Sequence, residues 1–110
     1  MPHDPKVCIE GAVSACTLII EFTSSMTEEE FNSDKKTQSA VERQFEVLGE
    51  ALNRLKQIDA NLFDKIEHAT EIVGFRNVIA HGYDVVDNEI VWDAVQHDTP
   101  QLLKQLNSLL

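Results

Sequence analysis

The stretch VERQFEVLGEALNRL, residues 41–55, decides the fold of this chain. Its apolar side chains recur at alternating steps of four and three residues: Val41, Phe45, Leu48, Leu52 and Leu55. This spacing places them along one side of an α-helix, so the stretch predicts a long amphipathic helix that needs apolar partners along its whole length. Asn32, Ser33 and Asp34, just upstream, are suitable N-caps for this helix.

Two other long segments have helical apolar patterns. Residues 6–22 are rich in apolar side chains and contain only Gly11 as a helix breaker, which predicts a first helix. From residue 66 onward apolar positions again recur at steps of three and four: Ile66, Ala69, Ile72, Val73, Ile79 and Ala80. Between these segments, Thr27 and Glu30 have the spacing of a capping box, and residues 61–66 predict a second short helix or turn.

The C-terminal part predicts two helices with a break between them. Residues 84–88 have the composition of a loop that ends in an N-cap, and residues 89–95 predict about two helical turns with Trp92 in the core. Thr99 followed by Pro100 is a typical helix start, with Thr99 as the N-cap. The closing helix then has a leucine stripe: Leu102, Leu103, Leu106, Leu109 and Leu110. No strand is predicted, so the fold class is all-α, an antiparallel bundle of four to five helices in one domain over residues 1–110.

Composition sets limits on the class of protein. Hydrophobic residues make up 43% and charged residues 25% of the chain, as is ordinary for a globular domain. No apolar run is long enough to span a bilayer, and the N-terminus lacks the pattern of a signal peptide, so we expect a cytoplasmic protein without a membrane segment. Cys8 and Cys16 are separated by about 12 Å along a helix axis, which predicts reduced core thiols rather than a disulfide.

The net charge of -10 argues against tight, nonspecific binding of nucleic acid by the isolated chain. It remains compatible with a nuclease that concentrates a few cations in one cleft, or that gains a basic surface by oligomerising. The sequence has no Gly-rich phosphate loop, no His-Glu-x-x-His, no Cys-x-x-Cys and no calcium loop. Asp84, Asp87 and Asp93 have no recognisable ligand spacing. We therefore expect neither a metal nor a cofactor.

The candidate site is the stretch GFRNVIAHGY, residues 74–83. Arg76 follows Ile72 by four residues and precedes Ile79 by three, so it falls on the apolar stripe where packing alone would favour another apolar side chain. An unpaired buried charge is costly, and a guanidinium at this position must therefore be paired or used. Asn77 is adjacent to it in the sequence.

His81 falls where this helix should end. Gly82 is a suitable terminator in the left-handed conformation, which places His81 in the last turn and Tyr83 on the segment that leaves the helix. Each residue also has a purely structural interpretation. Arg76 can be the buried partner of a glutamate, His81 a C-terminal cap favoured by the helix dipole, and Tyr83 a core aromatic with a satisfied hydroxyl.

The long helix also carries a row of like charges. Glu42, Glu46 and Glu50 repel one another at four-residue spacing. Such repulsion favours an outside cation, which can be Arg43 on the same helix or Arg76 from the next long helix. A solvated charged face is the alternative.

The pattern Arg76-x4-His81-x-Tyr83 resembles the R-x4-H-x-Y motif of HEPN-domain proteins, in particular the HepT-like toxins that pair with MntA-like nucleotidyltransferase antitoxins. Further blocks fall in the order and spacing of that branch, so the resemblance covers nearly the whole chain. These blocks are DKKTQSAV at 34–41, LGEA at 48–51, GFRN at 74–77 and IVW at 90–92.

This resemblance implies a HEPN-like bundle that acts as a metal-independent endoribonuclease. It implies a homodimer in which two motifs face each other across a cleft, with Arg76, Asn77 and His81 as catalytic residues and RNA, tRNA among the candidates, as substrate. It also implies that the antitoxin transfers AMP to Tyr83 and thereby blocks the nuclease. The alternative is a non-catalytic HEPN partner or regulatory subunit of a nucleotidyltransferase. A free-standing nucleotide binder has less support, because no phosphate-binding group is visible beyond Arg76.

Overall fold

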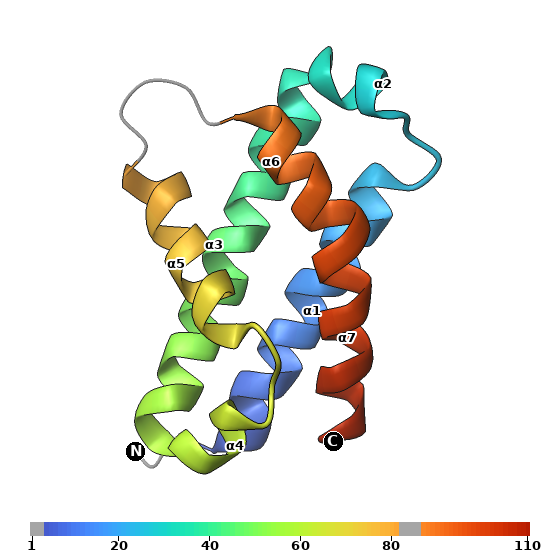
Figure 1. Cartoon of the computed structure of the whole chain (residues 1–110). Coiled ribbons are helices and arrows are strands. Elements are labelled where there is room, and N and C mark those ends of the chain that lie inside the picture. Colours follow the sequence, from blue (N-terminus) through green and yellow to red (C-terminus); the bar gives the residue numbers. More distant parts are fainter. Residues whose placement is uncertain (1–3, 82–86) are drawn as a thin grey trace.

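The computed structural model describes the backbone of residues 4–81 and 87–110, and the side chains of residues 4–75 and 87–110. In this part of the chain all regular structure is helical, which confirms the predicted all-α class. The elements in order are α1 (Pro5–Thr23), α2 (Glu28–Asn32), α3 (Lys35–Ile58), α4 (Ala60–Asp64), α5 (Ala69–His81), α6 (Asn88–Asp93), the π-helix η1 (Ala94–Asp98) and α7 (Thr99–Ser108). The long helices alternate in direction, and α2 and α4 lie at opposite ends of the bundle (Figure 1).

Helix α3 is the centre of the bundle. All five residues of its predicted stripe, Val41 to Leu55, are at most 1% exposed. The helix packs against α1 and against α5. Asp34 caps its N-terminus, because one carboxylate oxygen accepts from the Thr37 backbone N–H at 3.0 Å and the other accepts from the Thr37 hydroxyl at 2.7 Å. These hydrogen bonds hold the pKa of the Asp34 carboxyl below its usual range. The predicted long helix and its cap are confirmed.

The predicted capping box is also present at α2. The Thr27 hydroxyl accepts from the Glu30 backbone N–H at 3.1 Å, and the Thr27 N–H donates to a Glu30 carboxylate oxygen at 2.9 Å. This cap fixes a short helix that buries Phe31 completely. The Phe31 ring packs against Trp92 with ring centroids 5.3 Å apart. Trp92 was predicted to lie in the core, but it is only half-buried, because one side packs against Phe31 while the other borders a surface hollow.

The C-terminal region differs most from the prediction. Residues 88–108 form one continuous helix with a π-helical turn, and no break occurs at Thr99. Thr99 has helical φ and ψ of -65° and -47°, and its hydroxyl donates to the Ala94 carbonyl at 2.9 Å, so its predicted role as N-cap is wrong. Pro100 lacks an N–H, and in a regular α-helix its ring would clash with the carbonyl of residue 96. The wider π turn directly before it relieves that conflict without ending the helix. At the start of α6 the cap is Asp87, whose carboxylate accepts from the Glu89 N–H at 2.9 Å.

The cysteines are core residues, as predicted. Cys8 and Cys16 are both buried and free. Burial raises the pKa of the Cys16 thiol to about 12, so its thiolate is scarce at neutral pH and the group is chemically inert. Within residues 4–81 and 87–110, no helix combines the length and apolarity that crossing a bilayer requires.

The central stripe carries a first testable prediction. We expect Leu52→Ala to lower the free energy of unfolding by about 3 kcal/mol, because the side chain is fully buried and its loss leaves a cavity in the middle of α3. Urea denaturation followed by circular dichroism measures the change. Gln57→Ala, at an exposed position of the same helix, is the matched control and should change stability by no more than about 0.5 kcal/mol. Equal effects of the two substitutions would contradict a core centred on this stripe.

Candidate active site

Helix α5 carries three of the predicted site residues. Arg76, Asn77 and His81 all lie within Ala69–His81, which confirms that they belong to one helix. The side chains of these three residues lie outside the described part, as do Gly82 and Tyr83 altogether. The predicted inward direction of Arg76, the terminator role of Gly82 and the accessibility of Tyr83 therefore stay predictions.

An aromatic pair fixes α5 against α3 just before the motif. The rings of Phe75 and Phe45 meet edge to face, with centroids 5.2 Å apart and an interplanar angle of 78°. One turn earlier, Ile72 is only 6% exposed. These contacts set both the depth and the rotation of α5 immediately before Arg76, so the position of the motif backbone follows from packing against the central helix.

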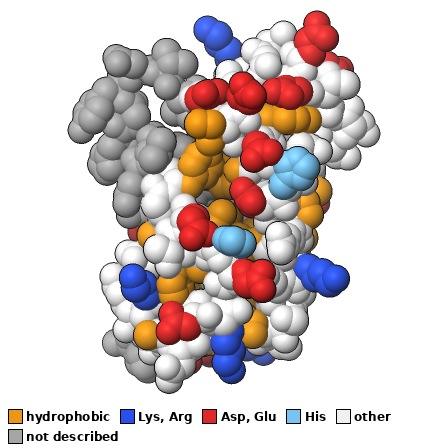
Figure 2. All heavy atoms as spheres, in the orientation of Figure 1, with side chains coloured by type: hydrophobic (Ala, Val, Ile, Leu, Met, Phe, Trp, Pro, Cys, Tyr) orange, Lys and Arg blue, Asp and Glu red, His pale blue; other side chains and the backbone are white. Residues whose placement is uncertain are grey.

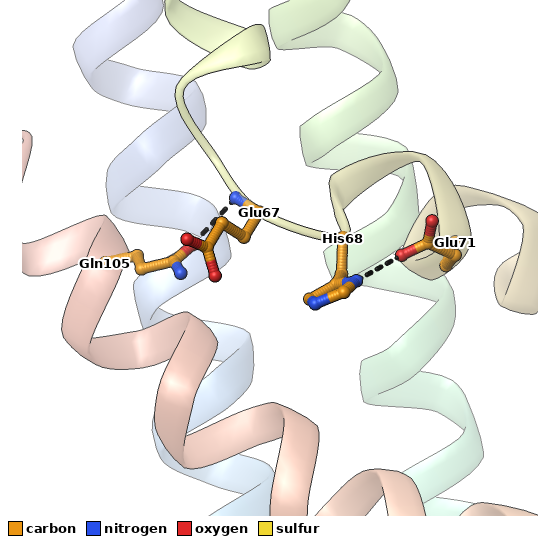
Figure 3. Close-up of polar contacts among 4 residues, drawn as sticks. All are labelled: Glu67, His68, Glu71 and Gln105. Carbon is orange, nitrogen blue, oxygen red and sulfur yellow. Dashed lines mark hydrogen bonds and ion pairs between the residues drawn. The ribbon is translucent and has the colours of Figure 1, made fainter.

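The beginning of α5 is fixed by polar contacts (Figure 3). His68 has a positive φ of 62°, which lets the chain turn sharply into the helix. Its ring Nδ1 lies 2.7 Å from a carboxylate oxygen of Glu71 in the first helical turn. The backbone N–H of Glu67 donates to the side-chain oxygen of Gln105 on α7 at 2.9 Å. His68 is exposed, as predicted, and lies at the end of α5 opposite to the motif.

The acidic row of α3 is partly neutralised by its own helix. Arg43 lies 3.6 Å from Glu46, and Arg54 lies 3.6 Å from Glu50. These pairs are largely solvated, so they contribute little to stability. Among the described side chains, Glu42 has no cation within ion-pair distance. Burial, and to a smaller extent the charge of Glu46, raises the pKa of the Glu42 carboxyl above its usual range.

Glu42 lies level with the motif. Helices α3 and α5 run antiparallel, and Phe45 of α3 faces Phe75 of α5. Position 42, one turn before Phe45, therefore lies level with the turn of α5 that follows Phe75. Sequence spacing singled out Glu42 only as one member of a repelling row. Glu42 and Glu46 are both half-buried and Glu50 is exposed. The burial that raises the pKa of Glu42 comes from tertiary packing, which sequence spacing does not show.

Metal binding has no visible basis in the described residues. No group of three or more His, Cys, Asp or Glu side chains in that part of the chain is placed to hold a metal ion. Asp87 caps α6, and Asp93 lies 3.6 Å from a ring nitrogen of His97, so both have other partners. Asp84 lies outside the described residues.

Comparison with known proteins gives the family. A family model described as "Ribonuclease HepT-like" matches residues 13–109. The chain belongs to the HepT-like ribonuclease family. A HepT-like relative from Thermococcus cleftensis, named "Probable ribonuclease HepT", is 34% identical over 109 residues, which are 99% of this chain and 98% of that protein. A relative from Methanocaldococcus jannaschii, named "Putative RNase MJ0127", is 36% identical over 92 residues, which are 84% of this chain and 75% of that protein. No solved structure matches the chain significantly.

The HepT-like assignment confirms the family predicted from the motif and its flanking blocks. It also agrees with the all-α, HEPN-like bundle seen in the structure. The matched region includes the whole of α5 and therefore Arg76, Asn77 and His81.

Proposed function

We propose that this HepT-like chain is a metal-independent endoribonuclease whose catalytic residues are Arg76, Asn77 and His81. The observation that carries the proposal is the family match over residues 13–109, together with the location of these residues in the last turns of one helix. Asn77 and His81 are four residues apart, which is the spacing of one helix face, and Arg76 directly precedes Asn77.

The chemistry of RNA cleavage fits this set of side chains. A base removes the proton of the 2′-hydroxyl, and the 2′-oxygen attacks phosphorus. The bond from phosphorus to the 5′-oxygen then breaks, leaving a 2′,3′-cyclic phosphate, and an acid protonates the departing 5′-oxygen. Histidine titrates near neutral pH and serves either as base or as acid, which assigns proton transfer to His81. Arg76 offers a bidentate fork to the phosphoryl oxygens, and Asn77 orients the group. Because the attacking group is the 2′-hydroxyl, DNA is not a substrate.

A homodimer completes the site. One histidine cannot act as base and acid in the same step, whereas a two-fold dimer brings a second His81 to the opposite side of the phosphate. It also joins two copies of Arg76, so that a chain with a net charge of -10 gains a local cationic cleft. We assign Glu42 to the support of this cleft. Its half-buried carboxyl group, on the turn of α3 level with the motif, is placed to accept a hydrogen bond from the Arg76 guanidinium.

Regulation is proposed to act through Tyr83. A MntA-like nucleotidyltransferase antitoxin transfers AMP from ATP to the phenolic oxygen and releases pyrophosphate. Tyr83 follows His81 by two residues, so the added phosphodiester introduces bulk and negative charge beside the position that the RNA phosphate must occupy.

A second function is favoured by one observation. The net charge of -10 suits a non-catalytic subunit that binds a nucleotidyltransferase more readily than a protein that binds RNA on its own. In that case the R-x4-H motif would present Tyr83 or stabilise the bundle without cutting RNA.

Cleavage by the isolated chain separates the two functions. We expect the purified protein, free of any partner, to cut total RNA and defined tRNA in the presence of EDTA. The products should end in 2′,3′-cyclic phosphate and 5′-hydroxyl groups, because the mechanism uses no metal and no external water for the first step. Intact mass of the same sample shows whether Tyr83 is unmodified. An unmodified, folded dimer that leaves all RNA intact would contradict the nuclease and favour the non-catalytic subunit.

A further inference from the structure

A groove runs between α5 and the helix formed by α6, η1 and α7. Helix α5 packs mainly on α3 and leaves a hollow of about 330 Å³ between itself and the α6–η1 wall. A second hollow of about 570 Å³ continues along α6 and shares Ile90 and Asp93 with the first. We refer to these two hollows together as the acidic groove. Figure 2 shows hydrophobic side chains between the two walls, with acidic and histidine side chains along them.

The floor of the acidic groove is apolar. Ile72 and Phe75 contribute from α5, and Ile90 and Ala94 contribute from α6 and η1. Ile90 is 56% exposed, which makes it one of the few large hydrophobic side chains on the described surface. Trp92 borders the second hollow and is half-buried. An apolar floor with polar rims is typical of surfaces that bind another molecule.

The rims of the acidic groove are negative on both sides. Glu71 lies on α5, and Asp93 and Asp98 lie on the opposite wall. Glu28, Asp87 and Glu89 border the second hollow. No Lys or Arg is among the described residues that line either hollow. The sequence explains the lack of cations on the α6 and η1 side, because residues 77–103 contain neither Lys nor Arg.

The two histidines at the rims only partly offset this charge. His68 pairs with Glu71 at 2.7 Å and His97 pairs with Asp93 at 3.6 Å, and all four side chains are at least 66% exposed. Asp98 of the first hollow and Glu28, Asp87 and Glu89 of the second have no ion-pair partner among the described side chains. The groove therefore presents a row of solvated carboxylates above an apolar floor, immediately beside the helix that ends at His81.

We propose that the acidic groove docks a cationic segment of a partner protein. Lys or Arg side chains of that segment pair with the rim carboxylates, and one or two apolar side chains pack on Ile72, Phe75 and Ile90. Charge complementarity of this kind steers association and fixes the register of the bound segment. The inference does not depend on nuclease activity, because it rests on the shape and charge of the groove alone.

Charge also argues against two other occupants. RNA is disfavoured, because its phosphates would face carboxylates. A second copy of the chain bound through the same surface is disfavoured as well. A two-fold contact places each residue near its own equivalent region, so the carboxylates of both copies would face one another.

The single tryptophan of the chain gives a direct assay. Trp92 borders the acidic groove, and no other tryptophan contributes to the emission. The probe is a tryptophan-free 12-residue peptide in which Lys and Leu alternate. We expect this peptide to shift the Trp92 emission in a saturable manner, and expect the affinity to fall as salt is raised. A peptide with Glu in place of Lys, and one with Ser in place of Leu, should bind much more weakly. Absence of saturable binding by the Lys-Leu peptide would overturn the proposal.

Matched variants locate the binding. The groove variant carries Glu71→Gln, Asp93→Asn and Asp98→Asn, and the control carries an equal charge change at exposed positions away from the groove. The control substitutions are Glu10→Gln, Glu21→Gln and Asp64→Asn. We expect the affinity for the peptide to fall about tenfold in the groove variant and less than about twofold in the control. Equal losses would show that only net charge matters, and would overturn the assignment to this groove.

Two further measurements test whether a second copy of the chain or RNA occupies the groove instead. Sedimentation of the groove variant without peptide should match the wild type; a changed oligomeric state would mean that the groove is an interface between copies of the chain. A labelled RNA oligonucleotide should leave the Trp92 emission unchanged. If RNA gave the saturable shift and the peptide did not, RNA would be the occupant and the proposal would be wrong. Circular dichroism checks that both triple variants keep the wild-type helix content.

Discussion

Cleavage of RNA by the His81→Ala variant should fall by a factor of about 10³, while the helix content and the oligomeric state stay those of the wild type. General acid or base catalysis by one side chain accounts for about 10²–10⁴ in rate, and in a homodimer the substitution removes both groups at once. The fold should tolerate the change, because His81 is the last residue of α5 and the packing of the helix is set earlier, by Ile72 and by the Phe75–Phe45 pair. Initial rates on a defined tRNA in EDTA measure the effect.

His3→Ala is the matched control for this experiment. It removes one histidine of the same chain at a position far from α5 in the sequence, and its cleavage rate should equal that of the wild type. The pH dependence adds an independent check. A wild-type rate that depends on one protonated and one neutral histidine should pass through a maximum near neutral pH and fall on both sides. A folded dimer of the His81 variant that cuts RNA at the wild-type rate would remove His81 from the mechanism.

Much of the fold could be predicted from the sequence because the decisive information is local. The five stripe residues of α3 repeat with helical spacing, and each is buried as that spacing requires. Capping is local as well, since Thr27 and Glu30 form the predicted capping box and Asp34, one of three candidate N-caps, bonds to Thr37 three residues later. The placement of His81 on α5 belongs to the same class, because it follows from helical periodicity.

The prediction failed where a distant or competing interaction decides the outcome. Thr99 and Pro100 form a local start signal, but the π-helical turn of η1 accommodates the proline within a continuous helix, and the Thr99 hydroxyl bonds backwards to Ala94. The residue types cannot distinguish a helix that starts at Pro100 from a continuous helix with a π turn before it. Either arrangement avoids a clash between the proline ring and the carbonyl four residues earlier. Trp92 is half-buried for a similar reason. Its exposure depends on how α6 packs against α2, where the ring meets Phe31 on one side and borders a hollow on the other.

The acidic groove also depends on packing between segments that are distant in the sequence. Glu71 lies on α5 whereas Asp93 and Asp98 lie on α6 and η1, and only the packing of α5 on α3 brings them to opposite sides of one hollow. The candidate active site stands between these two cases. The order of Arg76, Asn77 and His81 along α5 is local and was predictable, whereas the partners proposed for them, Glu42 of α3 and a second chain, are not local in the sequence.

AMP transfer to Tyr83 should silence the nuclease. After incubation with a MntA-like nucleotidyltransferase and ATP, we expect the mass of the chain to rise by one or more adenylyl groups. RNA cleavage should fall by a factor of about 10², since the added phosphate repels the substrate at a site that depends on the binding of negative charge. Tyr83 is the only tyrosine of the chain, so peptide mass spectrometry assigns a tyrosine modification without ambiguity. Intact mass and cleavage rate are measured on the same sample.

Tyr83→Phe separates modification from any other effect of the partner. It removes only the hydroxyl that accepts AMP, so the variant should cut RNA at nearly the wild-type rate and keep that rate after incubation with the transferase and ATP. If the partner silenced this variant as well, inhibition would come from binding rather than from adenylylation. An active transferase that leaves the wild-type mass unchanged would exclude Tyr83 as the acceptor. Because the groove variant keeps both Tyr83 and the motif, its rate of modification then shows whether the acidic groove presents the tyrosine to this transferase or serves a different cationic partner.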